Sequence, residues 1–174
     1  MRGFLELEAP GFRDWVRAQW GISIQSVCTG FDIQGSPERS LSRAVIQDQD
    51  QGLFLLDKFR RDKFERRRRV ARALGHLNRK GLSKALAYRP TASGEFLPFF
   101  RDHCYQVSRF VQGTALARPD YLESAPMGAS FASFLLDMNR AARGIGTIFP
   151  TRGFVISDYI VTLMEQADLH HPLA

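Results

Sequence analysis

The sequence predicts an α+β fold, and the order of its apolar patterns is the main reason. A short leading helix is followed by three strand-like stretches, a basic helix, further short strands and a region that is helical only. Strands that are segregated from helices in this way are typical of α+β proteins. With 174 residues, 44% of them hydrophobic, the chain is long enough to bury a stable core.

The first elements follow from apolar spacing and turn residues. Residues 11–20 place apolar side chains at helical spacing, and Gly21 provides a C-terminal stop. The loop 28–40 is rich in turn formers, and the turn 48–52 contains Asp and Gly. These breaks separate three predicted strands, at 22–27, 41–47 and 53–59.

A strongly basic helix is predicted over about 60–80. Val70, Leu74 and Leu77 share one face of it, and most arginines fall elsewhere. The segment 58–72 holds nine basic residues against two acidic ones, whereas the whole chain has a net charge of +6. The basic charge is therefore concentrated in this helix, and the rest of the chain is nearly neutral.

In the second half of the chain, a segment interrupted by proline and glycine is followed by predicted helices. Pro90, Gly94 and Pro98 interrupt the segment 82–112, which therefore cannot be one long helix. Short strands are predicted there, at 86–91, 95–100 and 103–111. Helices are predicted at 119–142 and 157–169, with a loop at 143–153 between them.

Composition excludes several classes of protein. The apolar content is too high for a disordered chain, and no apolar run is long enough to span a bilayer. The first residues contain acids where a secretory signal needs an apolar core, so we expect a cytoplasmic protein without membrane contact. Cys28 and Cys104 lack the spacing of a zinc site or a disulfide framework and are expected to be free thiols.

Several stretches share a family pattern through their order. These stretches read QGLFLLDKF, RRRRVARALGHLNRKGL, YQVSRFVQGTAL, RPDYLESAPMGASFASFLLDMNRAA and FVISDYIVTLM. They resemble the third strand with the ATP lysine, the next helix, the last small-lobe strand with the hinge, and two later helices. The family is that of the aminoglycoside and choline kinase-like phosphotransferases, which share the protein-kinase fold. The resemblance covers roughly residues 22–170.

The resemblance implies a domain organisation and an activity. Residues 1–112 would form a protein-kinase-like small lobe, an antiparallel sheet plus one helix, preceded by a leading helix. Residues 113–174 would form the hinge and the first helices of an incomplete helical lobe. The family binds ATP with Mg²⁺ and transfers the γ-phosphoryl group to a hydroxyl, here of a small molecule.

Lys58 is the first candidate site residue. On an extended strand Phe54, Leu56 and Lys58 share one face, so Lys58 faces the cleft if the other two do. The resemblance implies that its ammonium group contacts the α- and β-phosphates of ATP. Glu65 is the candidate acid partner, although the resemblance implies an acid at the position that Val70 occupies.

The other candidates act through their backbone. The loop from Gly30 to Gly35 lies between the first two strands, where the resemblance implies that backbone N–H groups cover the phosphates. Phe110 and Val111 lie in the implied hinge and would hold adenine through backbone hydrogen bonds. An ordinary hairpin loop and ordinary core residues are the alternative interpretations.

The chain contains no match to the family's H-x-D catalytic loop with its later Asn. Those residues are expected beyond Ala174, or else the chain acts without catalysis. The alternative function is a non-catalytic binding module that docks an acidic protein or nucleic acid through the basic helix. Nucleic acid is the less expected partner, because no aromatic side chains are interleaved for base stacking. The missing C-terminal part or a second copy of the chain could also be a partner.

Overall fold

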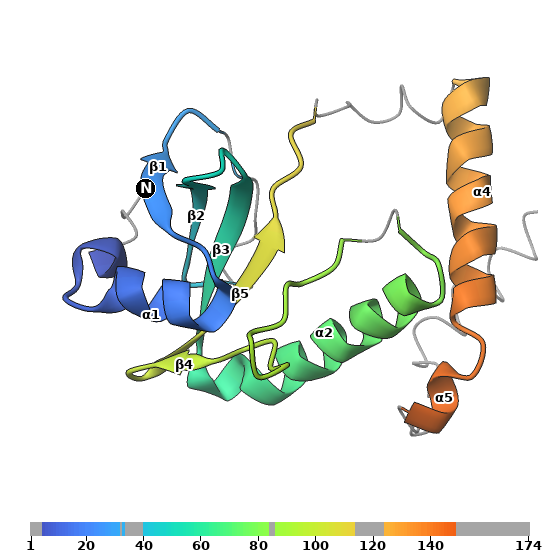
Figure 1. The fold of residues 1–174 in the computed structure, drawn as a ribbon. Helices are drawn as coiled ribbons and strands as arrows, with labels where there is room; N and C mark the ends of the chain where they lie inside the picture. The colour runs from blue at the N-terminus through green and yellow to red at the C-terminus, as the bar shows by residue number, and fades with distance from the viewer. Residues whose placement is uncertain (1–4, 32, 34–39, 84–85, 114–123, 149–174) are drawn as a thin grey trace, which may run out of the picture. The chain divides into compact units, whose positions relative to one another are not determined.

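The computed structural model is an α+β protein with a five-stranded antiparallel sheet (Figure 1). It describes residues 5–31, 33, 40–83, 86–113 and 124–148. The chain divides into two compact units, Met1–Ala142 and Arg143–Ala174, and the sheet lies in the first.

The sheet is formed by five strands in the order β1-β2-β3-β5-β4. The strands are β1 (Ile24–Cys28), β2 (Ser42–Asp48), β3 (Leu53–Arg60), β4 (Phe99–Phe100) and β5 (His103–Arg109). Every neighbouring pair is antiparallel. β3 lies in the middle of the sheet and is paired along its length with β2 and β5.

The helices of the first unit come before, within and after the sheet. They are the 3₁₀ turn η1 (Leu5–Glu8), α1 (Phe12–Trp20), the 3₁₀ turn η2 (Arg61–Lys63), α2 (Phe64–Arg79) and α4 (Ala125–Ala141). α1 ends at Gly21, which adopts the left-handed conformation that favours glycine. The second unit contains α5 (Ile145–Ile148). Among the helices of the described residues, none has the length and apolar character needed to cross a bilayer.

α1 and α2 cover opposite faces of the sheet. On the α1 side, Phe12, Val16 and Trp20 of the helix are buried against strand residues that include Leu56 and Tyr105. On the α2 side, Ala71 of the helix is buried against Phe59 and Cys104. Because successive residues of a strand point to opposite faces, β3 contributes alternately to both cores.

The structure confirms the leading helix, the first three strands, the basic helix and the strand predicted at 103–111. The strand predicted at 86–91 is wrong except for a single bridge between Tyr88 and Ser108. The strand predicted at 95–100 is reduced to β4. A turn closes between these segments, where the N–H of Gly94 donates to the carbonyl of Thr91 over 2.9 Å. Gly94 lies between the two predicted strands, and its φ of 84° suits this turn.

The later predictions are tested only in part. The helix predicted at 119–142 is present as α4 from Ala125, and residues 119–123 lie outside the described residues. α5 occupies part of the predicted loop 143–153. The helix predicted at 157–169 lies wholly outside the described residues.

The packing of α1 predicts a large effect of one core substitution. Phe12 is fully buried and contacts the rings of Trp15, Phe100 and Tyr105 at centroid distances of 5.0–5.5 Å. We expect Phe12→Ala to lower the free energy of unfolding by about 3–5 kcal/mol, because it leaves a cavity in this aromatic cluster. Urea denaturation followed by circular dichroism measures the change.

Phe131→Ala is the matched control, because Phe131 of α4 is 56% exposed. We expect this substitution to change the free energy of unfolding by less than about 0.5 kcal/mol. Equal effects of the two substitutions would contradict the assignment of the core to the α1 face.

Candidate functional site

Lys58 lies on the α1 side of the sheet. In the ladder between β3 and β5 it is directly opposite Tyr105, whose ring packs against Phe12 and Trp15. Opposite residues of a ladder share a face, so Lys58 is on the face that α1 covers. Its neighbours Phe54 and Leu56 pack on the same side, as the sequence predicted. This side faces away from α2.

Asp57 occupies the α2 side of β3. Its side chain is 5% exposed and forms an ion pair with Arg43, which lies directly opposite on β2. Both terminal groups are joined, since Nε and Nη2 of the arginine donate to the two carboxylate oxygens. Such a two-bond pair fixes the orientation of the guanidinium group. The charged group of β3 that faces α2 is thus a carboxylate, which is paired with an arginine of β2. It is not a lysine.

Other polar side chains lie on this face of the sheet. Gln106 is directly opposite Asp57 on β5, and Ser108 follows two residues later on the same side. Both are buried, and neither the amide of Gln106 nor the hydroxyl of Ser108 has a hydrogen-bond partner among the described residues. Buried polar groups without partners are uncommon and are concentrated at functional sites.

Tyr88 connects these residues to α2. Its backbone forms the bridge to Ser108, and its ring packs in the cluster with Phe59 and Ala71. Burial raises the pKa of the Tyr88 phenol, and the nearby Asp57 carboxylate raises it further. A hydrogen bond with Arg67 of α2 acts in the opposite direction. We call Arg43, Asp57, Arg67, Tyr88, Gln106 and Ser108 the polar row.

Glu65 is not brought to Lys58. It lies in the first turn of α2, where its carboxylate is 65% exposed and pairs with Arg68 over 3.3 Å. Lys58 belongs to the opposite face of the sheet. The structure therefore does not join the two residues expected to form the lysine–acid pair. The sequence signal that would have identified Asp57 is a single acid between large apolar residues of a strand, which is typical of a buried ion pair.

The segment that follows β5 lines a pocket. The pocket has a volume of about 760 Å³ and lies at the C-terminal end of α2. Its lining includes Phe110 and Val111 together with Asn78 of α2; the remaining lining residues are Ser83, Leu86, Ala87, Arg109 and Gln112. The N–H of Phe110 donates to the carbonyl of Leu53 over 2.9 Å and is thereby occupied. Val111 is 72% exposed, and its backbone makes no hydrogen bond with the described residues.

The loop after β1 approaches the same segment. The rings of Phe31 and Phe110 are in contact, with centroids 4.8 Å apart. Gly30 precedes Phe31, is exposed, and has open space where a side chain would begin. The structure thus brings one end of the predicted phosphate loop to the predicted hinge. Gly35 lies outside the described residues.

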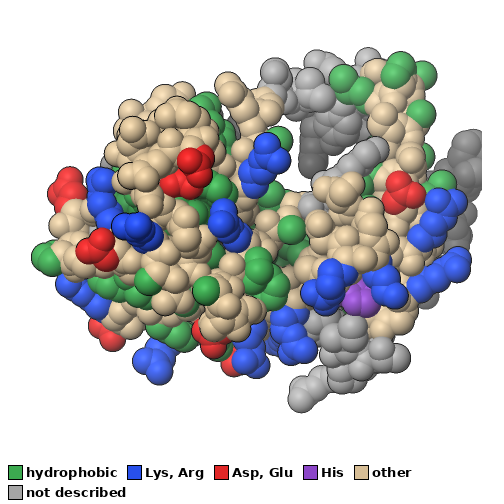
Figure 2. All heavy atoms as spheres, in the orientation of Figure 1, with side chains coloured by type: hydrophobic (Ala, Val, Ile, Leu, Met, Phe, Trp, Pro, Cys, Tyr) green, Lys and Arg blue, Asp and Glu red, His purple; other side chains and the backbone are tan. Residues whose placement is uncertain are grey.

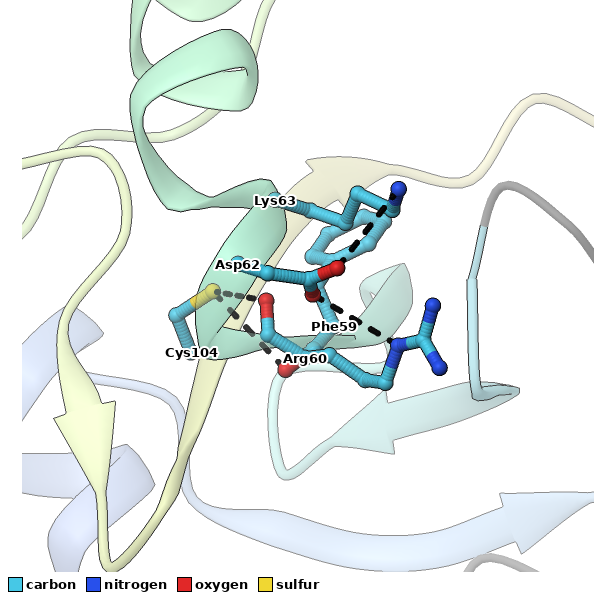
Figure 3. Close-up of polar contacts among 5 residues, drawn as sticks. All are labelled: Phe59, Arg60, Asp62, Lys63 and Cys104. Carbon is cyan, nitrogen blue, oxygen red and sulfur yellow. Dashed lines mark hydrogen bonds and ion pairs between the residues drawn. The ribbon is translucent and has the colours of Figure 1, made fainter.

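The junction between β3 and α2 is held by local contacts (Figure 3). The Asp62 carboxylate lies between Arg60 and Lys63 and pairs with both, over 3.5 and 3.6 Å. The thiol of Cys104 is directed at the carbonyl oxygens of Phe59 and Arg60, each 3.8 Å away. Burial raises the pKa of Cys104 to about 11, so the thiol stays protonated at neutral pH. A protonated, buried thiol is a poor nucleophile, and Cys104 is a structural residue.

The outer face of α2 is basic. Figure 2 shows Lys and Arg side chains along the helix. Two of the arginines have their guanidinium groups over aromatic rings: Arg67 over Phe59 at 4.3 Å and Arg68 over Phe64 at 5.6 Å. Arg66 and Arg69 are exposed and form no ion pair with any residue that the structure describes.

Metal ligands do not cluster in the described part of the chain, where no three His, Cys, Asp or Glu side chains come together. Comparison with protein-family models gives no match, and a search of curated proteins finds none that is similar. The geometry of the polar row and of the pocket therefore carries the functional argument.

The ion pair in the polar row predicts non-additive substitutions. We expect Asp57→Ala to lower the free energy of unfolding by about 2–4 kcal/mol, because it leaves Arg43 without its buried partner. The double variant Arg43→Met with Asp57→Leu should recover most of this loss, because it removes both charges. Urea denaturation of Arg43→Met, of Asp57→Leu and of the double variant gives the coupling energy. Additive effects would show that the pair contributes no coupling.

Cys104 predicts a specific alkaline destabilisation. The folded state holds the thiol proton more tightly than the unfolded chain, with a pKa of about 11 against the ordinary value of 9.0. The stability from the neutral thiol is therefore complete below about pH 9 and is lost by about 2–3 kcal/mol as the pH rises toward 11. Thermal unfolding of the protein and of Cys104→Ala between pH 7 and pH 11 measures this loss of stability. The two pH profiles should converge above about pH 9; parallel profiles would contradict the assignment.

Proposed function

We propose that the chain is the N-terminal segment of a kinase-like phosphotransferase, with residues 1–112 as its small lobe, and that it binds ATP as its Mg²⁺ complex. The observation that carries the proposal is the pocket lined by Phe110 and Val111 directly after the last strand of the sheet. The order of elements also supports it, since three strands, a helix, two further strands and an extended segment follow one another as the resemblance implies.

The pocket has the chemistry to hold a purine. Val111 offers a backbone N–H and a carbonyl that no described residue occupies, and a nucleobase edge carries matching acceptors and donors. Leu86 and Ala87 supply apolar surface, and Asn78 and Gln112 add polar groups. Half of the lining residues are apolar and half are polar, so the pocket offers both apolar surface and hydrogen-bonding groups to a ligand.

The phosphate contacts differ from those that the resemblance implies. Lys58 is on the α1 side of the sheet and Asp57 is on the α2 side, so a carboxylate stands where the lysine was expected. The strand cation on this side is Arg43, which Asp57 orients. Gly30 and its loop would contribute backbone N–H groups, because Phe31 contacts Phe110.

Transfer of the γ-phosphoryl group to a small-molecule hydroxyl needs a carboxylate that orients the acceptor and ligands that hold Mg²⁺. The chain has no H-x-D motif to provide them. The proposal therefore assigns nucleotide binding, and not the transfer step, to the residues of this chain.

Isothermal titration with ATP and Mg²⁺ tests the proposal. We expect binding heat at about 1 mM nucleotide, and we expect Ala87→Phe to weaken binding by at least about tenfold because the ring fills the pocket. Ala18→Phe is the matched control on the exposed side of α1 and should leave the affinity unchanged. Lys58→Met should also change the affinity by less than about twofold, because Lys58 lies on the other side of the sheet.

Two outcomes would count against the proposal. One is the absence of heat from a protein that circular dichroism shows to be folded. The other is an equal loss of affinity in Ala87→Phe and Ala18→Phe, which would place the nucleotide elsewhere.

A further inference from the structure

The outer face of α2 has exposed arginines next to an exposed apolar side chain. Arg66 has Arg69 and Val70 as neighbours on the helix surface, three and four residues later. Val70 is 39% exposed, and both arginines are exposed. We call these three residues the outer stripe.

The acidic side chains of this region form ion pairs with other basic residues. Asp62 pairs with Arg60 and Lys63, and Glu65 pairs with Arg68 over 3.3 Å. The two arginines of the outer stripe form no ion pair within the described residues. Two neighbouring guanidinium groups on a rigid helix therefore present their full charge to a partner.

We propose that the outer stripe docks an acidic, amphipathic segment of a protein partner. Carboxylates of the segment would pair with Arg66 and Arg69, and an apolar side chain would cover Val70. Guanidinium groups bind carboxylates through two parallel hydrogen bonds, which gives the contact orientation as well as charge complementarity. The inference does not depend on nucleotide binding, because the pocket and the outer stripe share no residue.

The composition of the surface favours a protein over nucleic acid. The segment 60–72 contains seven arginines and a single lysine. Arginine is enriched in protein interfaces and lysine is depleted. The exposed Val70, one turn after Arg66, adds apolar area that phosphates cannot use.

Two synthetic peptides of equal charge provide the probes. One contains Glu and Leu at the spacing of an amphipathic helix, and the other contains Glu and Ser in the same pattern. We expect the Glu–Leu peptide to bind at least about tenfold more tightly, measured by fluorescence anisotropy. Raising the salt from about 50 mM to about 500 mM should weaken both complexes, because exposed charges are screened.

Matched variants locate the site. The double variant Arg66→Gln with Arg69→Gln should weaken binding of the Glu–Leu peptide by at least about tenfold. Arg17→Gln removes an exposed helical arginine from α1 and should change the affinity by less than about twofold. Val70→Ser should abolish the preference for the Glu–Leu peptide without changing the salt dependence. Circular dichroism verifies that each variant is folded.

Several results would overturn the inference. Equal weakening by Arg17→Gln would show that only net charge matters. An unchanged peptide preference in Val70→Ser would show that no apolar contact is made. Tighter binding of an RNA or DNA oligonucleotide than of the Glu–Leu peptide would assign the surface to nucleic acid, and no binding of either peptide at about 1 mM would remove the site.

Discussion

The alternation of side chains along β3 is the constraint on which the rest of the structure depends. β3 is paired on both sides, and helices cover both of its faces, so its central residues alternate between the two cores. Leu56 belongs to the α1 side and Phe59 to the α2 side. A slip of one residue would exchange all these positions, so the register also decides the faces of Lys58 and Asp57.

The two faces differ in polarity as a result. The α1 side is an aromatic and aliphatic core built around Phe12 and Tyr105. The α2 side contains Asp57, which is buried and therefore requires the partner that Arg43 supplies from the next strand. Gln106 and Ser108 extend this polar row without satisfying each other, which reduces stability.

The sequence allowed the central elements to be predicted but not the direction of individual side chains. Strand 53–59 and helix 60–80 have long apolar patterns, and both are present. The run LFLLDKF is apolar at both parities, so it does not reveal which of Asp57 and Lys58 faces α2. The assignment of Lys58 to the cleft rested on a parity that only the pairing with Tyr105 could determine. The strands predicted near Pro90 and Pro98 were shortened because proline cannot donate to a ladder.

The residues that hold α2 against the sheet differ from the residues that α2 exposes. Consecutive arginines at 66–69 do not help an isolated helix, since like charges three or four residues apart cost about 0.2–0.5 kcal/mol per pair. The helix is held instead by its packing on the sheet, through Ala71 and through Arg67 stacked on Phe59. Because the inward face supplies the stability, the charges on the outward face contribute little to the fold. Their density is therefore better explained by what the surface contacts than by what the helix needs in order to form.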